Sequence, residues 1–422
     1  MKESLIRPIG GGFAVRGVVA GICQRCNATV PENVFDEYGF RYCRRCLAFG
    51  RVSEDSVLYR YERPLTCKRH RLAPAFPLTA EQARAAAFVV AKIRRRERGF
   101  LWAVCGAGKT EMLYEGLLYA LNRGDRICLA IPRKDIVAEL AVRLRPIFPD
   151  TVIKAMHQGA KDDEGAHILV ATIHQLIRYH QEFDLIVIDE ADAYPYRHDP
   201  YLHDLVAKAI KPDATVIAMS ATLDRSEERR IARGTTDAIM IPARFHRQPL
   251  DIPVVEYIGD LRDRIGNRTD LPAAVRTWLT QPSGTRRALL FVPTIAYGLC
   301  LHALLEREGY RSGVVSSREP AAAIRIRAFR EERFDLLVTT TLLERGVTFR
   351  GVDVAVLSAD DDIFDRDALV QISGRVGRYA DHPTGEIRLF SEVMTKAIHA
   401  AILWLGKMNK RAQARGLIDD DL

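Results

Sequence analysis

The sequence predicts an α/β protein with two lobes, each built on a parallel β-sheet, and a small cysteine-rich module ahead of them. From Phe76 onward, short apolar runs alternate with stretches of helical period, which is typical of βαβ units. This alternation occurs twice, on either side of a proline-rich stretch at 236–285. The module is indicated by four cysteines that form two close pairs before residue 47.

We therefore expect three regions: 1–75 holds the cysteine module and a linker, 76–240 the first lobe, and 241–422 the connection and the second lobe. The strands expected in the first lobe are 101–104, 127–131, 168–171, 185–188 and 215–219, with helices such as 110–122 and 134–144 between them. Those expected in the second lobe are 288–292, 336–339, 354–357 and 387–390. The proline-rich stretch is expected to be a crossing connection.

The chain has 422 residues, of which 48% are hydrophobic and 27% charged, so it can bury several cores without disulfide bonds. This balance excludes collagen-like, low-complexity and wholly disordered proteins. No window approaches the ~18 consecutive apolar residues that a membrane-spanning helix needs. The first 12 residues lack the apolar core of a secretory signal. A cytoplasmic location is the resulting expectation.

The net charge of +8 is unevenly distributed along the chain. Residues 1–98 hold 19 lysines and arginines against 9 acidic residues, a net of +10, so the other 324 residues sum to −2. A positive excess at one end favours a surface for a polyanion. The alternative is a basic segment that only keeps the chain soluble.

A phosphate-binding loop is predicted at 103–110, where the sequence AVCGAGKT follows an apolar run and precedes a helical pattern. Gly106 and Gly108 allow a tight turn whose N–H groups face phosphates. Lys109 can reach the β- and γ-phosphates, and the Thr110 hydroxyl can ligate Mg²⁺. The alternative is a glycine-rich turn with a solvated lysine. The expected ATP-binding residues are Gly106, Ala107, Gly108, Lys109 and Thr110.

An acidic partner for this loop follows about 80 residues later, where the apolar run 185–188 ends in Asp189-Glu190-Ala191-Asp192. Asp189 is expected to hold Mg²⁺, and Glu190 to orient and activate the attacking water as the base. The alternative is a capping cluster at the start of the next helix.

Three further segments fit the same chemistry in chain order. Gln82 lies 27 residues before Lys109, where a glutamine that reads adenine would lie, although a solvated helix glutamine fits nearly as well. Ser220-Ala221-Thr222 occupies the place of a segment that couples the nucleotide to the nucleic-acid path; a helix cap is the alternative. In QISGRVGR, Arg375 and Arg378 can stabilise charge on the transferred phosphoryl group from the second lobe. The alternative is that both arginines are simply exposed to solvent.

Polar residues at strand ends form a candidate nucleic-acid path. Ligands of open parallel sheets lie at the carboxyl ends of the strands, and hydroxyl and N–H groups there bind phosphates without reading bases. Threonine also simply suits strands, which is the alternative. The expected contacts are Arg133, Thr172, Thr340 and Thr341.

The cysteines Cys23, Cys26, Cys43 and Cys46 follow the spacing C-x2-C-x16-C-x2-C of zinc sites. Two such pairs supply four thiolates and close a tetrahedron, which favours structural zinc. The alternative is four reduced thiols in a small core. The arginines beside Tyr42 suit a single-stranded nucleic acid, and a protein-docking role fits equally.

The ordered motifs resemble those of superfamily 2 helicases over about 76–390. The segments GAGKTEM at 106–112 and DEADAYP at 189–195, with four cysteines before the helicase core, resemble the late competence helicase-like ATPases of the ComFA family. Ala191 replaces a valine that relatives often carry, which leaves the chemistry intact. The PriA helicases are also similar, but they place their zinc cysteines after the first lobe and are longer.

The resemblance implies two RecA-like lobes with an N-terminal zinc module, using ATP, Mg²⁺ and Zn²⁺. It implies a motor that pulls single-stranded DNA into the cell at the inner face of the membrane. The implied partners are a ComFC-like protein and the DNA-uptake channel; the oligomeric state stays open. One alternative is a duplex-unwinding, PriA-like helicase of replication restart or repair. A second is a zinc-dependent nucleic-acid adaptor without motor activity. An RNA-dependent helicase also remains open.

Overall fold

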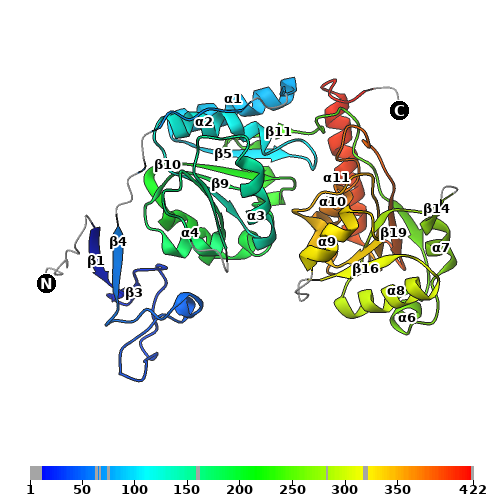
Figure 1. Cartoon of the computed structure of the whole chain (residues 1–422), viewed down its shortest axis with the longest axis horizontal. Helices are drawn as coiled ribbons and strands as arrows, with labels where there is room; N and C mark the ends of the chain where they lie inside the picture. Colours follow the sequence, from blue (N-terminus) through cyan, green and yellow to red (C-terminus); the bar gives the residue numbers. More distant parts are fainter. Residues whose placement is uncertain are drawn as a thin grey trace. The chain divides into compact units, whose positions relative to one another are not determined.

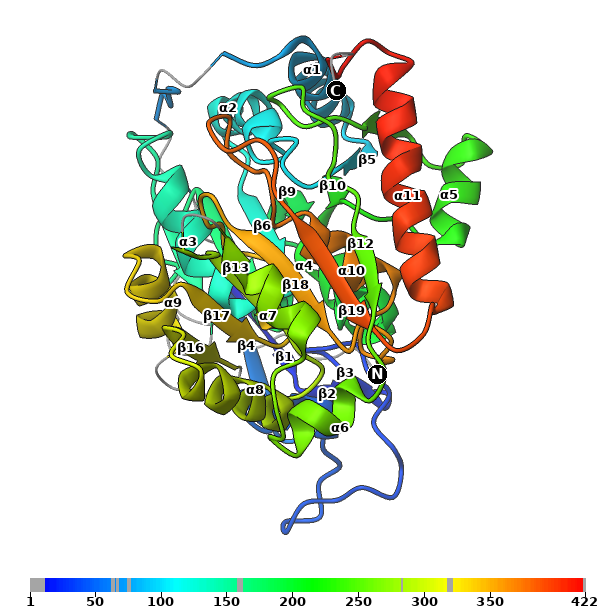
Figure 2. The ribbon, with the colours of Figure 1, turned by 90° about the vertical axis from the view of Figure 1, so that its right-hand side faces the viewer.

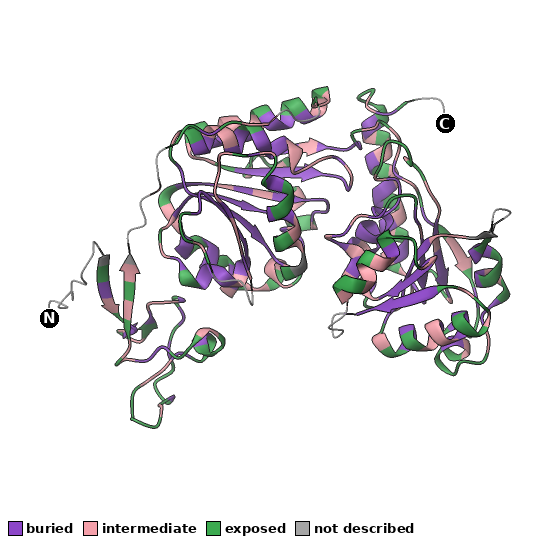
Figure 3. Cartoon of the chain, viewed as in Figure 1, coloured by how far each residue is buried: buried purple, intermediate pink, exposed green. Residues whose placement is uncertain are grey.

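The structure is a computed structural model that describes residues 12–61, 65, 68–73, 77–157, 162–281, 284–316 and 322–419. The chain divides into two compact units, residues 1–101 with 110–239 and residues 102–109 with 240–422. In both units the strands are largely buried, whereas the helices expose one side (Figure 3). The expected α/β fold with two parallel-sheet lobes is confirmed.

The N-terminal module contains short antiparallel pairs and one 3₁₀ helix (Figure 1). Its elements are β1 (Gly12–Arg16) paired with β4 (Val57–Tyr61), β2 (Val18–Val19) paired with β3 (Ile22–Cys23), and η1 (Arg44–Phe49). The four cysteines and three valines of the module belong to the same buried cluster as side chains of β9 and α4 in the first lobe. The module therefore shares a hydrophobic core with the lobe that follows it.

The first lobe is a seven-stranded sheet in the order β11-β5-β10-β9-β6-β8-β7. The strands are β5 (Arg98–Ala103), β6 (Ile127–Ile131), β7 (Ile153–Met156), β8 (Ile168–Thr172), β9 (Phe183–Ile188), β10 (Ile210–Ser220) and β11 (Ala238–Ile241). Every residue of β6, β8 and β9 is buried, as expected for central parallel strands covered on both faces. Helices α1 and α2 lie on one side of the sheet and α4 on the other (Figure 1).

The two helices named from the sequence in this lobe, 110–122 and 134–144, are present, and the first of them begins differently. The helices of the lobe are α1 (Ala80–Arg95), η2 (Glu111–Leu113), α2 (Tyr114–Asn122), α3 (Lys134–Leu144), η3 (Ile173–Arg178), η4 (Tyr196–His198), α4 (Pro200–Ala209) and α5 (Arg225–Ala232). The helix expected at 110–122 starts instead as the 3₁₀ turn η2 and becomes α-helical only at Tyr114.

The second lobe is a six-stranded parallel sheet in the order β12-β19-β18-β15-β17-β16 (Figure 2). Its strands are β12 (Val254–Tyr257), β15 (Ala288–Phe291), β16 (Ser312–Val315), β17 (Leu336–Thr339), β18 (Asp353–Leu357) and β19 (Ile387–Ser391). Its helices are α6 (Leu261–Gly266), α7 (Ala273–Leu279), α8 (Ile295–Arg307), α9 (Ala322–Arg330), η5 (Thr341–Glu344), α10 (Arg366–Ser373) and α11 (Lys396–Gln413). A small hairpin joins β13 (Thr280–Gln281) to β14 (Gly284–Thr285).

In the two large sheets, as far as the structure describes them, four strands were not anticipated: β7, β11, β12 and β16. The short pairs β1–β4, β2–β3 and β13–β14 were not anticipated either. The proline-rich stretch 236–285 is correspondingly more than a connection, because it supplies β11 to the first sheet and β12 to the second. Over the residues described, none of the helices combines the length and apolar character needed to cross a membrane.

Candidate nucleotide and zinc sites

The predicted phosphate loop follows β5 and turns back on itself. Gly106 and Gly108 have φ values of +81° and +80°, which a residue with a side chain rarely adopts. The Lys109 ammonium donates to the carbonyl oxygens of Ala103 (2.9 Å) and Val104 (3.3 Å), so it lies over the start of the loop. Thr110 makes no side-chain capping bond to η2, so the helix does not use its hydroxyl. The loop thus has the turn and the cation that phosphate binding needs.

The acidic pair follows β9 in a constrained backbone. Glu190 has a φ of +54°, uncommon for a non-glycine residue, and its N–H donates to Asp189 Oδ1 at 2.9 Å. One carboxylate oxygen, Glu190 Oε2, is buried without a hydrogen-bond partner. A strained backbone and an unsatisfied buried acceptor are features of functional sites. Such an oxygen can accept a proton from an attacking water.

The segment after β10 is joined to the acidic box. The buried Thr222 hydroxyl donates to Asp192 Oδ2 at 2.6 Å, and Ala191 N–H donates to Met219 O at 2.9 Å. Sequence reasoning assigned no role to Asp192, although it is the last residue of the acidic motif. This bond links the acidic box that follows β9 to the Ser220–Thr222 segment at the end of β10.

The phosphate loop, the acidic pair and the Ser220–Thr222 segment each follow a strand of the first sheet. β5, β10 and β9 are consecutive in the sheet, and β10 and β9 are parallel. Gln82 lies at the start of α1, where its Oε1 accepts from Thr79 N–H in a capping box (2.9 Å). At 6% exposure it is not the solvated helix residue of the alternative interpretation.

The two arginines predicted from the second lobe follow α10. Arg375 is only 3% exposed, and its guanidinium donates to Val347 O. Arg378 is half-buried, and its Nε donates to Gly374 O at 2.6 Å. Both are therefore held in place, and neither is the solvated arginine of the alternative.

The predicted nucleic-acid contacts lie at strand ends in both units. In the first lobe, Thr172 is the last residue of β8 and lies directly opposite Ile131, the last residue of the parallel strand β6. Arg133 lies two residues after Ile131 in the chain. His174 lies beside them, and burial lowers its pKa, so near neutral pH it supplies no positive charge. In the second lobe, Thr340 and Thr341 follow β17, and Thr341 begins η5.

The four module cysteines converge. Their sulfurs lie within 4.8 Å of one another, and all four residues are buried. Cys23 and Cys46 Sγ are 3.7 Å apart, and Cys26 and Cys43 Sγ 3.5 Å. A tetrahedral zinc ion with Zn–S distances of about 2.3 Å holds its sulfurs about 3.8 Å apart. The donor set and its dimensions therefore fit a closed, structural zinc site.

Comparison with known proteins gives two matching family models. Residues 75–225 match the type III restriction enzyme res subunit, and residues 271–380 match the helicase conserved C-terminal domain. Among solved structures, *Saccharomyces cerevisiae* Dbp5 bound to RNA and ADP BeF3 superposes with a TM-score of 0.55 at 16% identity, covering 78% of this chain and 91% of Dbp5. That likeness confirms the RecA-like helicase fold of the two lobes.

Two curated relatives match almost end to end. Competence protein ComFA of *Bacillus subtilis* (strain 168) is 37% identical over 400 residues, covering 92% of this chain and 86% of the relative. Competence protein ComFA of *Streptococcus pneumoniae* (strain ATCC BAA-255 / R6) is 34% identical over 393 residues, covering 92% and 90%. More distantly, the transcription-repair-coupling factor of *B. subtilis* is 24% identical over 346 residues, which is 27% of its length.

Proposed function

This chain belongs to the ComFA family of competence proteins, and on that premise we propose that it is an ATP-driven motor that moves along single-stranded DNA during DNA import. The family and the two helicase domains make it a helicase-like enzyme of superfamily 2 that hydrolyses ATP. Its dependence on DNA and the direction of transport are the parts that we propose.

The observation that carries the proposal is the buried Glu190 Oε2, which has no hydrogen-bond partner. Asp189 and Glu190 follow β9, and the phosphate loop follows β5 of the same sheet. In the proposed site the loop N–H groups and Lys109 bind the β- and γ-phosphates of ATP. Thr110 and Asp189 would hold Mg²⁺, which neutralises phosphate charge when bound. Glu190 orients a water and takes its proton. Gln82 would contact adenine from the start of α1.

Arg375 and Arg378 would complete this site from the second lobe by stabilising charge on the transferred phosphoryl group. The hydrogen bond between Thr222 and Asp192 would couple the nucleotide site to the bound DNA strand. In this proposal Arg133, Thr172, Thr340 and Thr341 contact the DNA backbone. The protein would act in the cytoplasm at the inner face of the membrane, with a ComFC-like partner and the uptake channel.

The test is ATP hydrolysis by the purified, zinc-loaded protein, alone and with single-stranded DNA, duplex DNA or RNA. Stimulation by single-stranded DNA above the other two supports the proposal, and Lys109→Ala should remove the activity. Equal stimulation by RNA would overturn the DNA assignment. Turnover that no nucleic acid changes would overturn the motor. A fork-unwinding assay separates transport from the duplex-unwinding alternative.

A further inference from the structure

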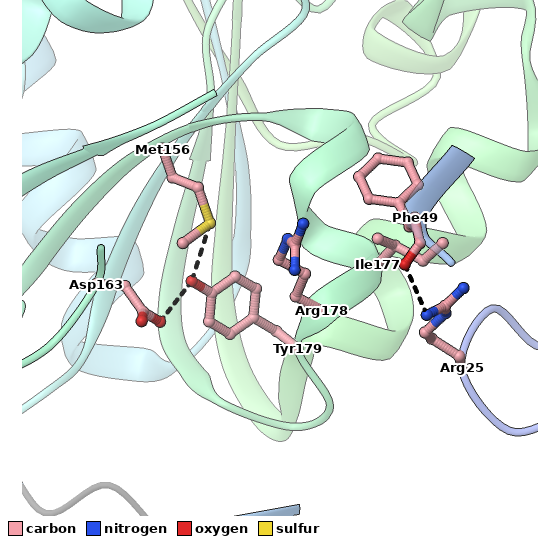
Figure 4. A pocket seen from close by; sticks show the side chains of 7 residues that line it. All are labelled: Arg25, Phe49, Met156, Asp163, Ile177, Arg178 and Tyr179. Carbon is pink, nitrogen blue, oxygen red and sulfur yellow. Dashed lines mark hydrogen bonds between the residues drawn. The ribbon is translucent and has the colours of Figure 1, made fainter. Parts of the chain in front are cut away.

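A pocket of about 280 Å³ lies where the zinc module meets the first lobe (Figure 4). This volume is near the lower end for small-ligand sites, about 300 Å³, so the pocket could accommodate part of one nucleotide but not a folded partner. The module contributes Arg25 and Phe49, and the lobe contributes Met156, Asp163 and the segment 177–179 at the end of η3. The nucleotide and zinc chemistry described above uses none of these side chains.

One wall of the pocket combines a cation with an aromatic ring. Arg178 is exposed, and its guanidinium carbon lies 5.6 Å from the centre of the Phe49 ring. Its Nε donates to Gln175 Oε1 at 2.8 Å, which fixes the plane of the guanidinium. A guanidinium on a half-buried ring is the combination that binds a phosphate and stacks a base.

The opposite wall is uncharged except for one carboxylate. The Tyr179 hydroxyl donates to Asp163 Oδ2 at 2.6 Å and lies 3.3 Å from Met156 Sδ (Figure 4). Because Asp163 repels anions, a phosphate is favoured on the Arg178 side. The pocket thus has a positive charge at Arg178 and a negative charge at Asp163, an arrangement that suits one nucleotide with its base between the two walls.

Polar bonds hold the module in place and join it to the lobe beside this pocket. The Arg25 guanidinium donates to the carbonyl oxygens of Phe49 (3.1 Å) and Cys46 (2.9 Å), so it positions the ring. Lys208 of α4, 7% exposed, donates to Arg25 O and to Ile177 O (2.9 Å). One ammonium therefore links the loop between two zinc cysteines to the residue before Arg178. Burial lowers the pKa of Lys208 to about 8.

The pocket is also continuous with the predicted nucleic-acid path. The helix η3 runs from Ile173, next to Thr172, to Arg178. Six residues of 3₁₀ helix span about 12 Å, so the pocket lies a short distance from the carboxyl end of β8. A strand that contacts Thr172 can therefore reach Arg178.

We propose that this pocket binds one nucleotide of single-stranded DNA, with its phosphate on Arg178 and its base against Phe49, and so extends the path from the first lobe onto the zinc module. The proposal rests on the proposed function, because it assumes that the chain binds a single strand. It assigns the zinc module a direct contact with the DNA strand, made by Phe49 at the end of η1 rather than by the zinc site.

The test is binding of a fluorescein-labelled thirty-residue oligothymidylate by the full-length, zinc-loaded protein, followed by fluorescence anisotropy at several salt concentrations. Arg178→Gln should weaken binding by about tenfold and make the slope of log affinity against log salt shallower by about 0.7, the value for one phosphate contact. Phe49→Leu should weaken binding by about tenfold without changing the slope, since it removes stacking but no charge.

The matched control is Arg229→Gln, which removes one exposed arginine from α5 and should leave affinity and slope unchanged. Zinc content and circular dichroism establish that the variants are folded. If the wild type binds and both pocket variants match it in affinity and slope, the pocket proposal is overturned while the proposed function stands. If the wild type binds no single strand at any salt concentration, the proposed function itself fails, and this inference fails with it.

Discussion

The bond between Thr222 and Asp192 allows a sharp test of how the acidic box is held. Thr222→Val keeps the shape of the side chain but removes the hydroxyl that donates to the carboxylate at 2.6 Å. A hydrogen bond to a charged group contributes about 1.5–3 kcal/mol, and both residues are buried. In a unit of this size, each kcal/mol of lost stability lowers the thermal midpoint by about 2–4 °C. The thermal midpoint of the first unit should therefore fall by roughly 3–12 °C.

A matched control lies on the preceding strand. Thr215 of β10 is fully buried, but its hydroxyl oxygen has no hydrogen-bond partner. Replacing an unsatisfied buried hydroxyl with a methyl group removes a desolvation cost, so Thr215→Val should be neutral or stabilising. The two variants make the same chemical change, one within β10 and one just after it, and they differ in whether a hydrogen bond is lost.

The assay is differential scanning calorimetry of the two variants and the wild type, together with ATP turnover with and without single-stranded DNA. We expect Thr222→Val to lose DNA stimulation more than basal turnover, because the bond joins the acidic box to the segment after β10. Equal midpoint shifts for the two valine variants would refute the energetic argument. Unchanged stimulation in Thr222→Val would refute the coupling role.

Three further predictions concern the two sites. Glu190→Gln should abolish turnover while ATP binding, measured by equilibrium titration, persists; hydrolysis at the wild-type rate would show that Glu190 is not the base. Arg375→Gln should lower kcat by about 10³–10⁵ with ATP affinity retained, as for other arginines that act on the phosphoryl group; a normal kcat would exclude that role. Cys23→Ala with Cys26→Ala should remove zinc, as measured by elemental analysis, and disturb the module while sparing the motor fold. Absence of zinc from the wild type would remove the zinc assignment.

The sheets show which strands a single sequence can predict. The nine strands expected from apolar runs are all present, and the four missed in the two large sheets are the two edge strands of each. Central strands are covered on both faces and read as continuous apolar runs, such as Phe183–Ile188. Edge strands are covered less and tolerate polar residues or proline. Lys154 lies within β7, and Pro253 directly precedes β12.

Charge was harder to interpret than motif order. The excess of positive charge in residues 1–98 predicted a surface that binds a polyanion. Some of these basic residues instead form ion pairs with acidic residues from elsewhere in the chain. Lys92 contacts Glu97 (2.6 Å) and Asp237, and Arg96 contacts Asp125 (3.4 Å). Asp125 and Asp237 lie outside the counted window, so only the fold reveals the pairing. The pocket at Arg178 was likewise unpredictable, because its lining comes from two parts of the chain more than 100 residues apart, Arg25 and Phe49 in one and residues 156–179 in the other.

The core that the zinc module shares with the first lobe has a practical consequence for dissecting this protein. Leu202, Leu205 and Ile186 pack in the same buried cluster as the zinc cysteines. A fragment trimmed to begin at residue 77 would therefore leave an apolar face of α4 and the sheet open to water, and such faces promote aggregation. The helicase portion is best produced with its module attached, because the module covers this apolar face.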